Sequence, residues 1–201
     1  MLFSVSGLKA KEHAPEKVQT AKGSVDHLDT EAHDDEFVID VISKPDGLGS
    51  IARNAVKHYY SSGAFNLIQL CLYILKQTGP AHVFLASYSI AERSIQTLVN
   101  HKEAGDILSV RFLVDNRVRT ISPKPFDFML NAFPGCTRCR TLHAKVLLIW
   151  NDEWKVDVVC SQNATHNPKL ERGTIYTMDD VFMFDKSVLE YEFEQGTVER
   201  T

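Results

Sequence analysis

The sequence predicts an α/β fold built on a mixed β-sheet flanked by helices on both faces. Between residues 81 and 114, an apolar strand, an amphipathic helix and a second strand follow one another, an order that favours a parallel, right-handed crossover. Further along, a polar turn at residues 151–155 joins two apolar runs rich in β-forming residues, which indicates an antiparallel hairpin. With 201 residues, 44% of them apolar, the chain is long enough to bury one substantial core.

The N-terminal part divides into a polar segment and the first elements of the domain. Residues 1–35 carry many acids and few large apolar groups, so we expect them to be poorly packed, ahead of a single domain over residues 36–201. The apolar run 37–42 predicts a strand that ends in a turn at Pro45. Ser50 is a candidate cap for a helix over residues 51–60.

The middle of the chain carries the clearest periodic patterns. Residues 64–76 form a strongly apolar helix pattern that Gly79 and Pro80 terminate. Residues 81–88 predict the first core strand, residues 91–102 a helix and residues 108–114 the next strand.

The C-terminal part begins with a proline-punctuated loop and a short helix over residues 126–132. The hairpin strands follow at residues 142–150 and 158–163. The rest of the chain predicts two further strands, at residues 173–177 and 181–184, and a final acidic helix at residues 186–194.

Two pairs of polar residues interrupt the hairpin strands. His143 and Lys145 are two positions apart in the first strand, and Ser161 and Asn163 are two positions apart at the end of the second. Side chains at i and i+2 of a strand share a face, so pairing the strands brings an imidazole, an ammonium, a hydroxyl and an amide to one patch. This set of groups suits a phosphate. The alternative is that the pattern arose by chance. Burying unpaired polar groups in otherwise apolar strands costs folding free energy, so their presence here favours a functional role over a chance match.

These residues resemble the single HKD motif of the short members of the phospholipase D-like superfamily. That motif combines His-x-Lys, a later Asp, Gly-Ser-x-Asn and a Glu or Asp. In this chain it reads His143-Ala144-Lys145, Cys160-Ser161-Gln162-Asn163 and Leu170-Glu171-Arg172. Trp150 stands where the family has its Asp, and Cys160 stands where it has its Gly. The resemblance covers roughly residues 60 to 185.

The resemblance implies a phospholipase D-like phosphodiesterase that needs no metal or other cofactor. His143 would attack phosphorus and form a covalent phosphohistidine, and a second His would protonate the leaving oxygen. Lys145 and Asn163 would hold the non-bridging oxygens, while Glu171 would accept a hydrogen bond from His143 and fix its tautomer. Because the chain contains one His-x-Lys, the resemblance also implies a homodimer whose two-fold axis brings two copies of His143 together.

The distribution of charge supports nucleic acid as the substrate, and we expect DNA ahead of RNA. The net charge is −4, yet Lys and Arg exceed acids by five between Arg111 and Lys145, and such clusters neutralise backbone phosphates. We therefore assign Arg138, Arg140 and Ser161 to substrate binding. The alternative is a solvated loop whose arginines face water.

No stretch of the sequence approaches the roughly 20 apolar residues of a membrane span, and the N-terminus does not read as a signal peptide. We therefore expect a cytoplasmic endonuclease rather than a phospholipase, which would require a route to a membrane. The altered Asp and Gly positions leave open a catalytically degenerate nucleic-acid-binding or assembly module. Cys136 and Cys139 form half of a zinc motif without a second pair, so we expect free thiols there.

Overall fold

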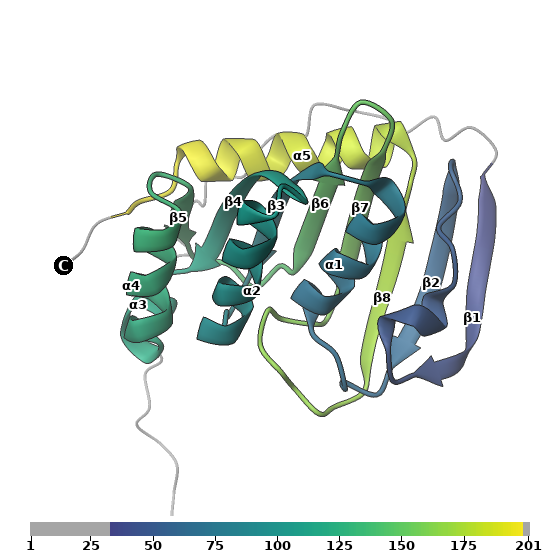
Figure 1. Cartoon of the computed structure of the whole chain (residues 1–201), viewed down its shortest axis with the longest axis horizontal. Helices are drawn as coiled ribbons and strands as arrows, with labels where there is room; N and C mark the ends of the chain where they lie inside the picture. Colours follow the sequence, from purple (N-terminus) through teal and green to yellow (C-terminus); the bar gives the residue numbers. More distant parts are fainter. Residues whose placement is uncertain (1–32, 199–201) are drawn as a thin grey trace, which may run out of the picture.

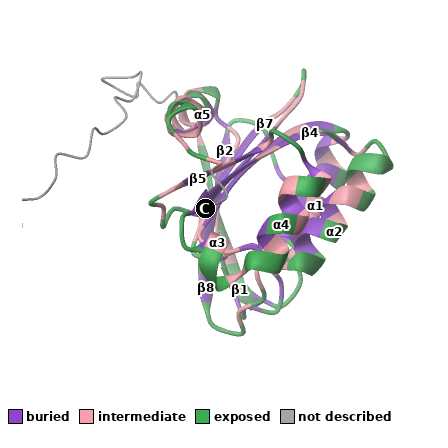
Figure 2. Cartoon of the chain, turned by 90° about the vertical axis from the view of Figure 1, so that its left-hand side faces the viewer, coloured by how far each residue is buried: buried purple, intermediate pink, exposed green. Residues whose placement is uncertain are grey.

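In the computed structural model, which describes residues 33–198, eight strands form one mixed sheet in the order β1-β2-β8-β7-β6-β3-β4-β5 (Figure 1). The strands are β1 Asp34–Ile42, β2 Ala55–Ser61, β3 Ala81–Ser87, β4 Ile107–Asp115, β5 Thr137–Arg140, β6 Val146–Trp150, β7 Lys155–Cys160 and β8 Glu171–Tyr176. The helices are η1 Pro45–Leu48, α1 Leu67–Thr78, α2 Glu92–Glu103, α3 Val118–Ile121, α4 Pro123–Ala132 and α5 Asp179–Glu194. Helices α1, α2 and α4 cover one face of the sheet and α5 crosses the other (Figure 2). The predicted fold class is confirmed.

Both predicted connections are present. Strands β3 and β4 are parallel neighbours joined through α2, and β6 and β7 form an antiparallel hairpin. The hairpin turn is built around Asn151, whose side-chain oxygen accepts hydrogen bonds from the backbone N–H groups of Glu153 (3.0 Å) and Trp154 (2.8 Å). Such a turn fixes the register of the two strands that it joins.

Alternation along the central strands separates two apolar cores. Leu85, Leu147 and Val158 point into the larger core beneath α1, α2 and α4. Phe84 and Leu148 point the other way, into the smaller core beneath α5. Because successive side chains on a strand face opposite ways, the parity of a residue number on each strand decides which helical layer it meets.

Two predicted elements are wrong, and one strand was missed. Residues 51–60 do not form a helix; Ala55–Ser61 is strand β2, hydrogen-bonded between β1 and β8, where its valine and tyrosines fit a pleated surface. Residues 181–184 are helical within α5, because Phe182 and Leu189, seven positions apart, share the buried face of one helix. The short strand Thr137–Arg140 was not predicted.

At the N-terminal side, the predicted strand over residues 37–42 is confirmed as part of β1, which begins earlier, at Asp34. The prediction of a poorly packed N-terminal segment falls, up to residue 32, outside the described residues. Within residues 33–198, no helix combines the length and apolar character needed to span a bilayer.

Candidate active site

The predicted catalytic residues gather at one end of the sheet, the lower end in Figure 1. There β3, β4 and β7 end, while β6 and β8 begin. His143 and Lys145 lie directly before β6, Asn163 follows β7, and Glu171 opens β8. The hydrogen bonding of β7 to both β6 and β8 therefore brings three separate stretches of sequence side by side.

Lys145 is a buried cation next to the imidazole of His143. Only 8% of Lys145 is exposed. Its Nζ donates a hydrogen bond to the carbonyl oxygen of His143 (2.8 Å) and lies 3.4 Å from each nitrogen of the His143 ring. Burial lowers the pKa of Lys145, and the charge of Glu171 acts in the opposite direction. The site therefore places one desolvated positive charge beside an exposed imidazole.

The backbone before His143 is anchored to β4. The buried carboxylate of Asp115 accepts a hydrogen bond from the N–H of Leu142 (3.0 Å) and from the backbone and Nε of Arg117 (3.0 and 2.9 Å). Although burial opposes the change, these hydrogen bonds lower the pKa of Asp115. Asp115 thus fixes both the residue before His143 and the guanidinium of Arg117.

Tyr88 connects Arg117 to His143. Its ring meets the His143 ring edge to face with centroids 5.2 Å apart, and the guanidinium of Arg117 lies 4.6 Å from the centroid of Tyr88. Such contacts hold a cation over an aromatic face. Neither Tyr88 nor Arg117 was predicted from the sequence to belong to the site. The available signal was their position directly after two parallel strands, whose ends meet at one edge of the sheet.

Glu171 is held by Ser161 and Asn167. Its carboxylate accepts a hydrogen bond from Ser161 Oγ and another from Asn167 Nδ2 (2.8 Å), and the N–H of Arg172 donates to Ser161 Oγ (3.0 Å). The predicted hydrogen bond from His143 to Glu171 is not among the contacts of the described residues. Glu171 instead acts on the cluster through its charge, which stabilises the positive form of Lys145.

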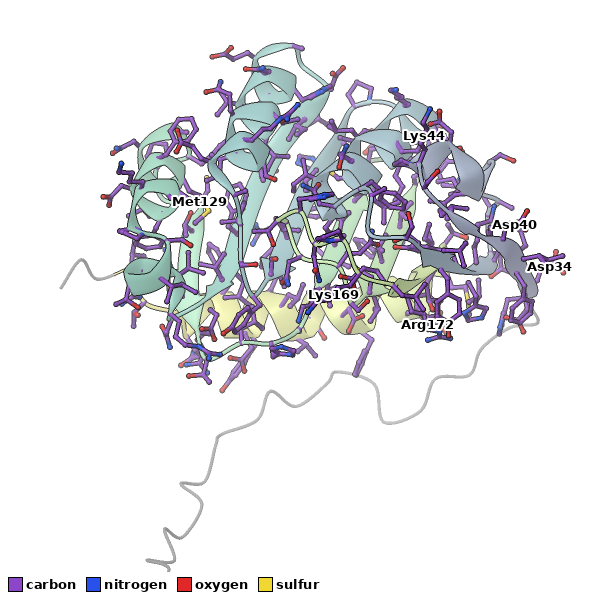
Figure 3. The ribbon with its side chains drawn as sticks, turned by 90° about the horizontal axis from the view of Figure 1, so that it is seen from below. Asp34, Asp40, Lys44, Met129, Lys169 and Arg172 are labelled. Carbon is purple, nitrogen blue, oxygen red and sulfur yellow. The ribbon has the colours of Figure 1, made fainter. Side chains whose placement is uncertain are left out.

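The segment between β7 and β8 is packed at several points. Asn163 accepts a hydrogen bond through its carbonyl from the first N–H of α1 (Leu67, 3.1 Å), and its side-chain oxygen lies 3.5 Å from Ser87 Oγ at the end of β3. Gly63, at φ +75°, crosses this segment so closely that a Cβ would lie 2.2 Å from the carbonyl oxygen of Asn167. Figure 3, which looks onto this end of the sheet, shows Lys169 within the segment.

Arg138 and Arg140 are not part of this cluster. On β5 they alternate with Cys139, which packs into the α1 side core, so both arginines face α5. Arg140 Nε pairs with Glu192 Oε2 (2.7 Å), and the guanidinium of Arg138 lies 4.8 Å from the ring centroid of Phe193. Both arginines are therefore engaged with α5 and not with the cluster around His143.

The two departures from the motif have structural explanations. Trp150 packs on the α5 side, with its ring centroid 5.3 Å from that of His82 and 5.9 Å from that of Phe182. Cys160 sits on β7 beside Lys145, and burial raises the pKa of its thiol to about 12, so it remains protonated at neutral pH. Neither residue removes a group from the cluster around His143.

Cys136 and Cys139, the two cysteines of the CxxC sequence, lie just before β5 and on it, respectively. Cys139 is buried on β5, and both thiols are free. In the part of the chain that the structure describes, no group of three or more His, Cys, Asp or Glu side chains is arranged to hold a metal ion.

The fold is similar to that of known phospholipase D-like proteins. No family model and no curated protein matches the sequence. The structure is similar to that of Nuc, a phospholipase D family member from Salmonella typhimurium, with a TM-score of 0.54 and 19% identity, over 73% of this chain and 98% of that chain. It is also similar to part of a polyphosphate kinase from Porphyromonas gingivalis, with a TM-score of 0.50 and 13% identity, over 73% of this chain and 27% of that one. At these identities the likeness establishes a phospholipase D-like α/β fold.

Proposed function

We propose that this protein is a metal-independent phosphodiesterase that cleaves nucleic acid through a phosphohistidine on His143. The observation that carries this proposal is the buried ammonium of Lys145, 3.4 Å from the ring of an exposed histidine. An ammonium taken out of water lowers the stability of a fold unless it is paired. Its position next to a nucleophile is therefore better explained by stabilisation of a substrate anion than by stabilisation of the protein.

The reaction would proceed in two displacements. A nitrogen of the His143 ring attacks phosphorus, the bond to the leaving oxygen breaks, and that oxygen takes a proton from a second imidazole. Water then attacks phosphorus, the second imidazole accepts its proton, and the phosphorus–nitrogen bond breaks. Lys145 and the amide of Asn163 hold the non-bridging oxygens as negative charge grows in both steps.

The second imidazole would come from another copy of the chain. His143 is the histidine that adjoins Lys145, so one chain supplies half of the acid–base pair that the mechanism requires. A two-fold axis through this end of the sheet would place two copies of His143 on opposite sides of one phosphorus atom.

Exposed cations beside the cluster support nucleic acid as the substrate class. Arg117, Lys169 and Arg172 are exposed around the same end of the sheet, the last two labelled in Figure 3. Exposed cations near a phosphodiesterase site suit a ligand with one negative charge per nucleotide. We propose DNA ahead of RNA as the polymer that is cut.

The test of this function is hydrolysis of single- and double-stranded DNA and RNA in excess EDTA. Wild-type protein is expected to cleave in the presence of the chelator, and His143→Ala to lose activity by at least about 10³-fold because the nucleophile is absent. His101→Ala, at the far end of α2, is the matched control and should retain activity. Cleavage that stops in EDTA and returns with a divalent metal would contradict the mechanism. Binding without cleavage of any substrate would indicate a degenerate nucleic-acid-binding module.

The shared site can be tested by mixing chains. Light scattering should give twice the 22.7 kDa mass of one chain. After exchange with an equal amount of His143→Ala chain, the activity per wild-type chain should fall by about half, since half of the wild-type chains then face a partner without the histidine. An activity that stays constant on mixing would show that each chain works alone.

A further inference from the structure

A cavity lies beside the proposed catalytic cluster, between the N-terminal ends of α1 and α2. Its volume is about 560 Å³, within the range of ligand sites. Figure 1 shows the segment between β7 and β8 passing below the lower end of α1. The lining includes four neutral polar side chains, those of Asn66, Gln69, Ser94 and Thr97.

Two basic side chains open into this cavity without a partner. Arg93 comes from the first turn of α2, and His166 comes from the segment that also carries Asn163. Among residues 33–198, neither the guanidinium of Arg93 nor the ring of His166 has a hydrogen-bond or ion-pair partner, and both residues are exposed. The lining contains no carboxylate, so the positive charge in the cavity is not neutralised locally.

The walls of the cavity are hydrogen-bonded directly to the segment that carries the residue proposed to hold the scissile phosphate. Ser94 Oγ, in a residue 4% exposed, donates to the carbonyl of Ala164 (2.7 Å), and the N–H of Ala91 donates to the same oxygen (3.2 Å). Asn66 Nδ2 in turn donates to Ser94 Oγ (3.3 Å). The cavity therefore has a fixed position relative to Asn163, which directly precedes Ala164.

The two helix ends differ in a way that favours an anion near α2. At α1, Asn66 and Gln69 form a capping box that satisfies the first-turn N–H groups. At α2 the cap position is Ala91, which has no side-chain oxygen, so the first turn near Arg93 keeps free N–H donors. Glu92 is the acidic residue of that turn, and it does not line the cavity.

We propose that this cavity binds a phosphate of the polynucleotide that neighbours the scissile one, with Arg93 supplying the positive charge and the ring of His166 a further hydrogen bond. The inference rests on the proposed phosphodiesterase function and specifies its substrate class as an oligonucleotide with at least one flanking phosphate. Ile68 and the methyl groups of Ala64 and Ala91 give the cavity an apolar side that suits the sugar attached to that phosphate. A diester without a flanking phosphate does not occupy the cavity, so the cavity does not contribute to its binding.

The experiment compares two substrates and two cation-removing variants. Bis(p-nitrophenyl) phosphate has no flanking phosphate, and a short single-stranded oligonucleotide has several. Arg93→Ala is expected to raise KM for the oligonucleotide roughly tenfold with kcat unchanged, through loss of a charge-assisted hydrogen bond, and to leave both constants for the small diester unchanged. The control is Lys76→Ala, which removes one exposed cation from the opposite end of α1.

Further readouts separate this site from general electrostatics. In Arg93→Ala, the slope of the logarithm of the oligonucleotide binding constant against the logarithm of the salt concentration should decrease in magnitude by about one. His166→Ala, on an exposed segment, should raise KM in the same direction, and Arg93→Lys should restore most of the loss. Equal effects of Arg93→Ala and Lys76→Ala would overturn the proposal. So would a fall in kcat for the small diester in Arg93→Ala or His166→Ala, because it would place these residues in the chemical step.

Failure of the phosphodiesterase function would be recognised independently. If wild-type protein cleaves neither substrate, fluorescence anisotropy of a labelled oligonucleotide still measures the cavity. Weaker binding by Arg93→Ala than by Lys76→Ala would support a phosphate site on a non-catalytic protein. Identical binding by the wild type and both variants would overturn the cavity assignment whatever the activity.

Discussion

Lys145→Met is expected to reduce phosphodiester hydrolysis by about 10²–10³-fold and, at the same time, to raise the free energy of unfolding. The first effect follows from the loss of a fixed positive charge at the oxygens where negative charge accumulates. The second follows from burial: methionine keeps most of the length of the lysine stem and removes an ammonium from a residue that is 8% exposed. An increase of about 1 kcal/mol is expected near neutral pH.

The pH dependence of this stability difference has a defined sign. Burial lowers the pKa of Lys145 in the folded protein below the ordinary lysine value of 10.5. The unfolded chain therefore holds the proton more tightly, and the stability of the wild type rises with pH through the window that ends at the unfolded pKa. The advantage of Lys145→Met should be complete below the folded pKa and vanish as the pH rises past about 10.5.

The matched control is Lys57→Met, because Lys57 is also buried but is paired. Its Nζ lies 2.8 Å from Glu36 Oε2 and donates to the carbonyl of Leu48 (3.0 Å). Removing this ammonium leaves both acceptors without their donor, so Lys57→Met should destabilise the fold and leave kcat unchanged. Urea unfolding at pH 7 and pH 10, together with kcat, measures both variants. Loss of stability in Lys145→Met equal to that in Lys57→Met would contradict a functional origin for the buried charge.

The parts of the site that the sequence predicted come from neighbouring strands. His143, Lys145, Asn163 and Glu171 fall within 29 residues, over which the consecutive strands β6, β7 and β8 pair with one another. The hairpin was predicted correctly, but its strands are shorter than predicted: His143 and Lys145 precede β6 and Asn163 follows β7, so strand pairing brings these residues together whereas side-chain alternation does not orient them. The predictions of the β3–α2–β4 crossover and of α1 succeeded because each depends on local periodicity.

The residues that the sequence did not assign depend on long-range pairing. Tyr88 and Arg117 reach His143 because β3 pairs with β6 and Asp115 binds Leu142, contacts between distant parts of the chain. Arg138 and Arg140 were assigned to the substrate site, but β5 is a four-residue strand whose alternation only the pairing with β4 defines. A shift of one residue there would have placed both arginines on the other face.

The failures at β2 and α5 have a related physical cause. Residues 51–60 contain no clear alternation because Lys57 and Ser61 are buried together with Tyr59 on the face toward α1. The segment Val181–Phe184 is apolar and aromatic, which locally favours a strand. The eight strands of the sheet do not include it, and the segment instead belongs to helix α5, which covers one face of the sheet. Tertiary context overrode propensity in both segments.

Asp157→Asn is expected to stabilise the protein at neutral and alkaline pH. Asp157 lies on β7, fully buried on the face toward α5, where its carboxyl group faces that of Asp185 on α5. Burial raises the pKa of Asp157 well above 3.8, and the nearby carboxylate of Asp185 on α5 raises it further. The nearest cation on its own strand, Lys155, is paired with Asp179 instead.

The sign of the pH dependence is opposite to that of Lys145. Because the folded protein holds the Asp157 proton more tightly than the unfolded chain, the stability of the wild type falls as the pH rises above the unfolded value of about 3.9. The loss proceeds at up to about 1.4 kcal/mol per pH unit until the folded pKa is reached. The amide that Asp157→Asn introduces cannot ionise, so the difference between variant and wild type should be near zero at about pH 4 and grow with pH.

Urea unfolding between pH 4 and pH 9 measures this difference directly. The control is Asp179→Asn, which removes an exposed carboxylate from the first turn of α5. It should change the free energy of unfolding by a small amount that is nearly the same at every pH. A stability difference for Asp157→Asn that is the same at every pH would mean that Asp157 is ionised in the folded protein. In that case a cation must reach it beneath α5. A growing difference would instead establish that α5 is docked over a protonated carboxyl group, and that its packing weakens as the pH rises.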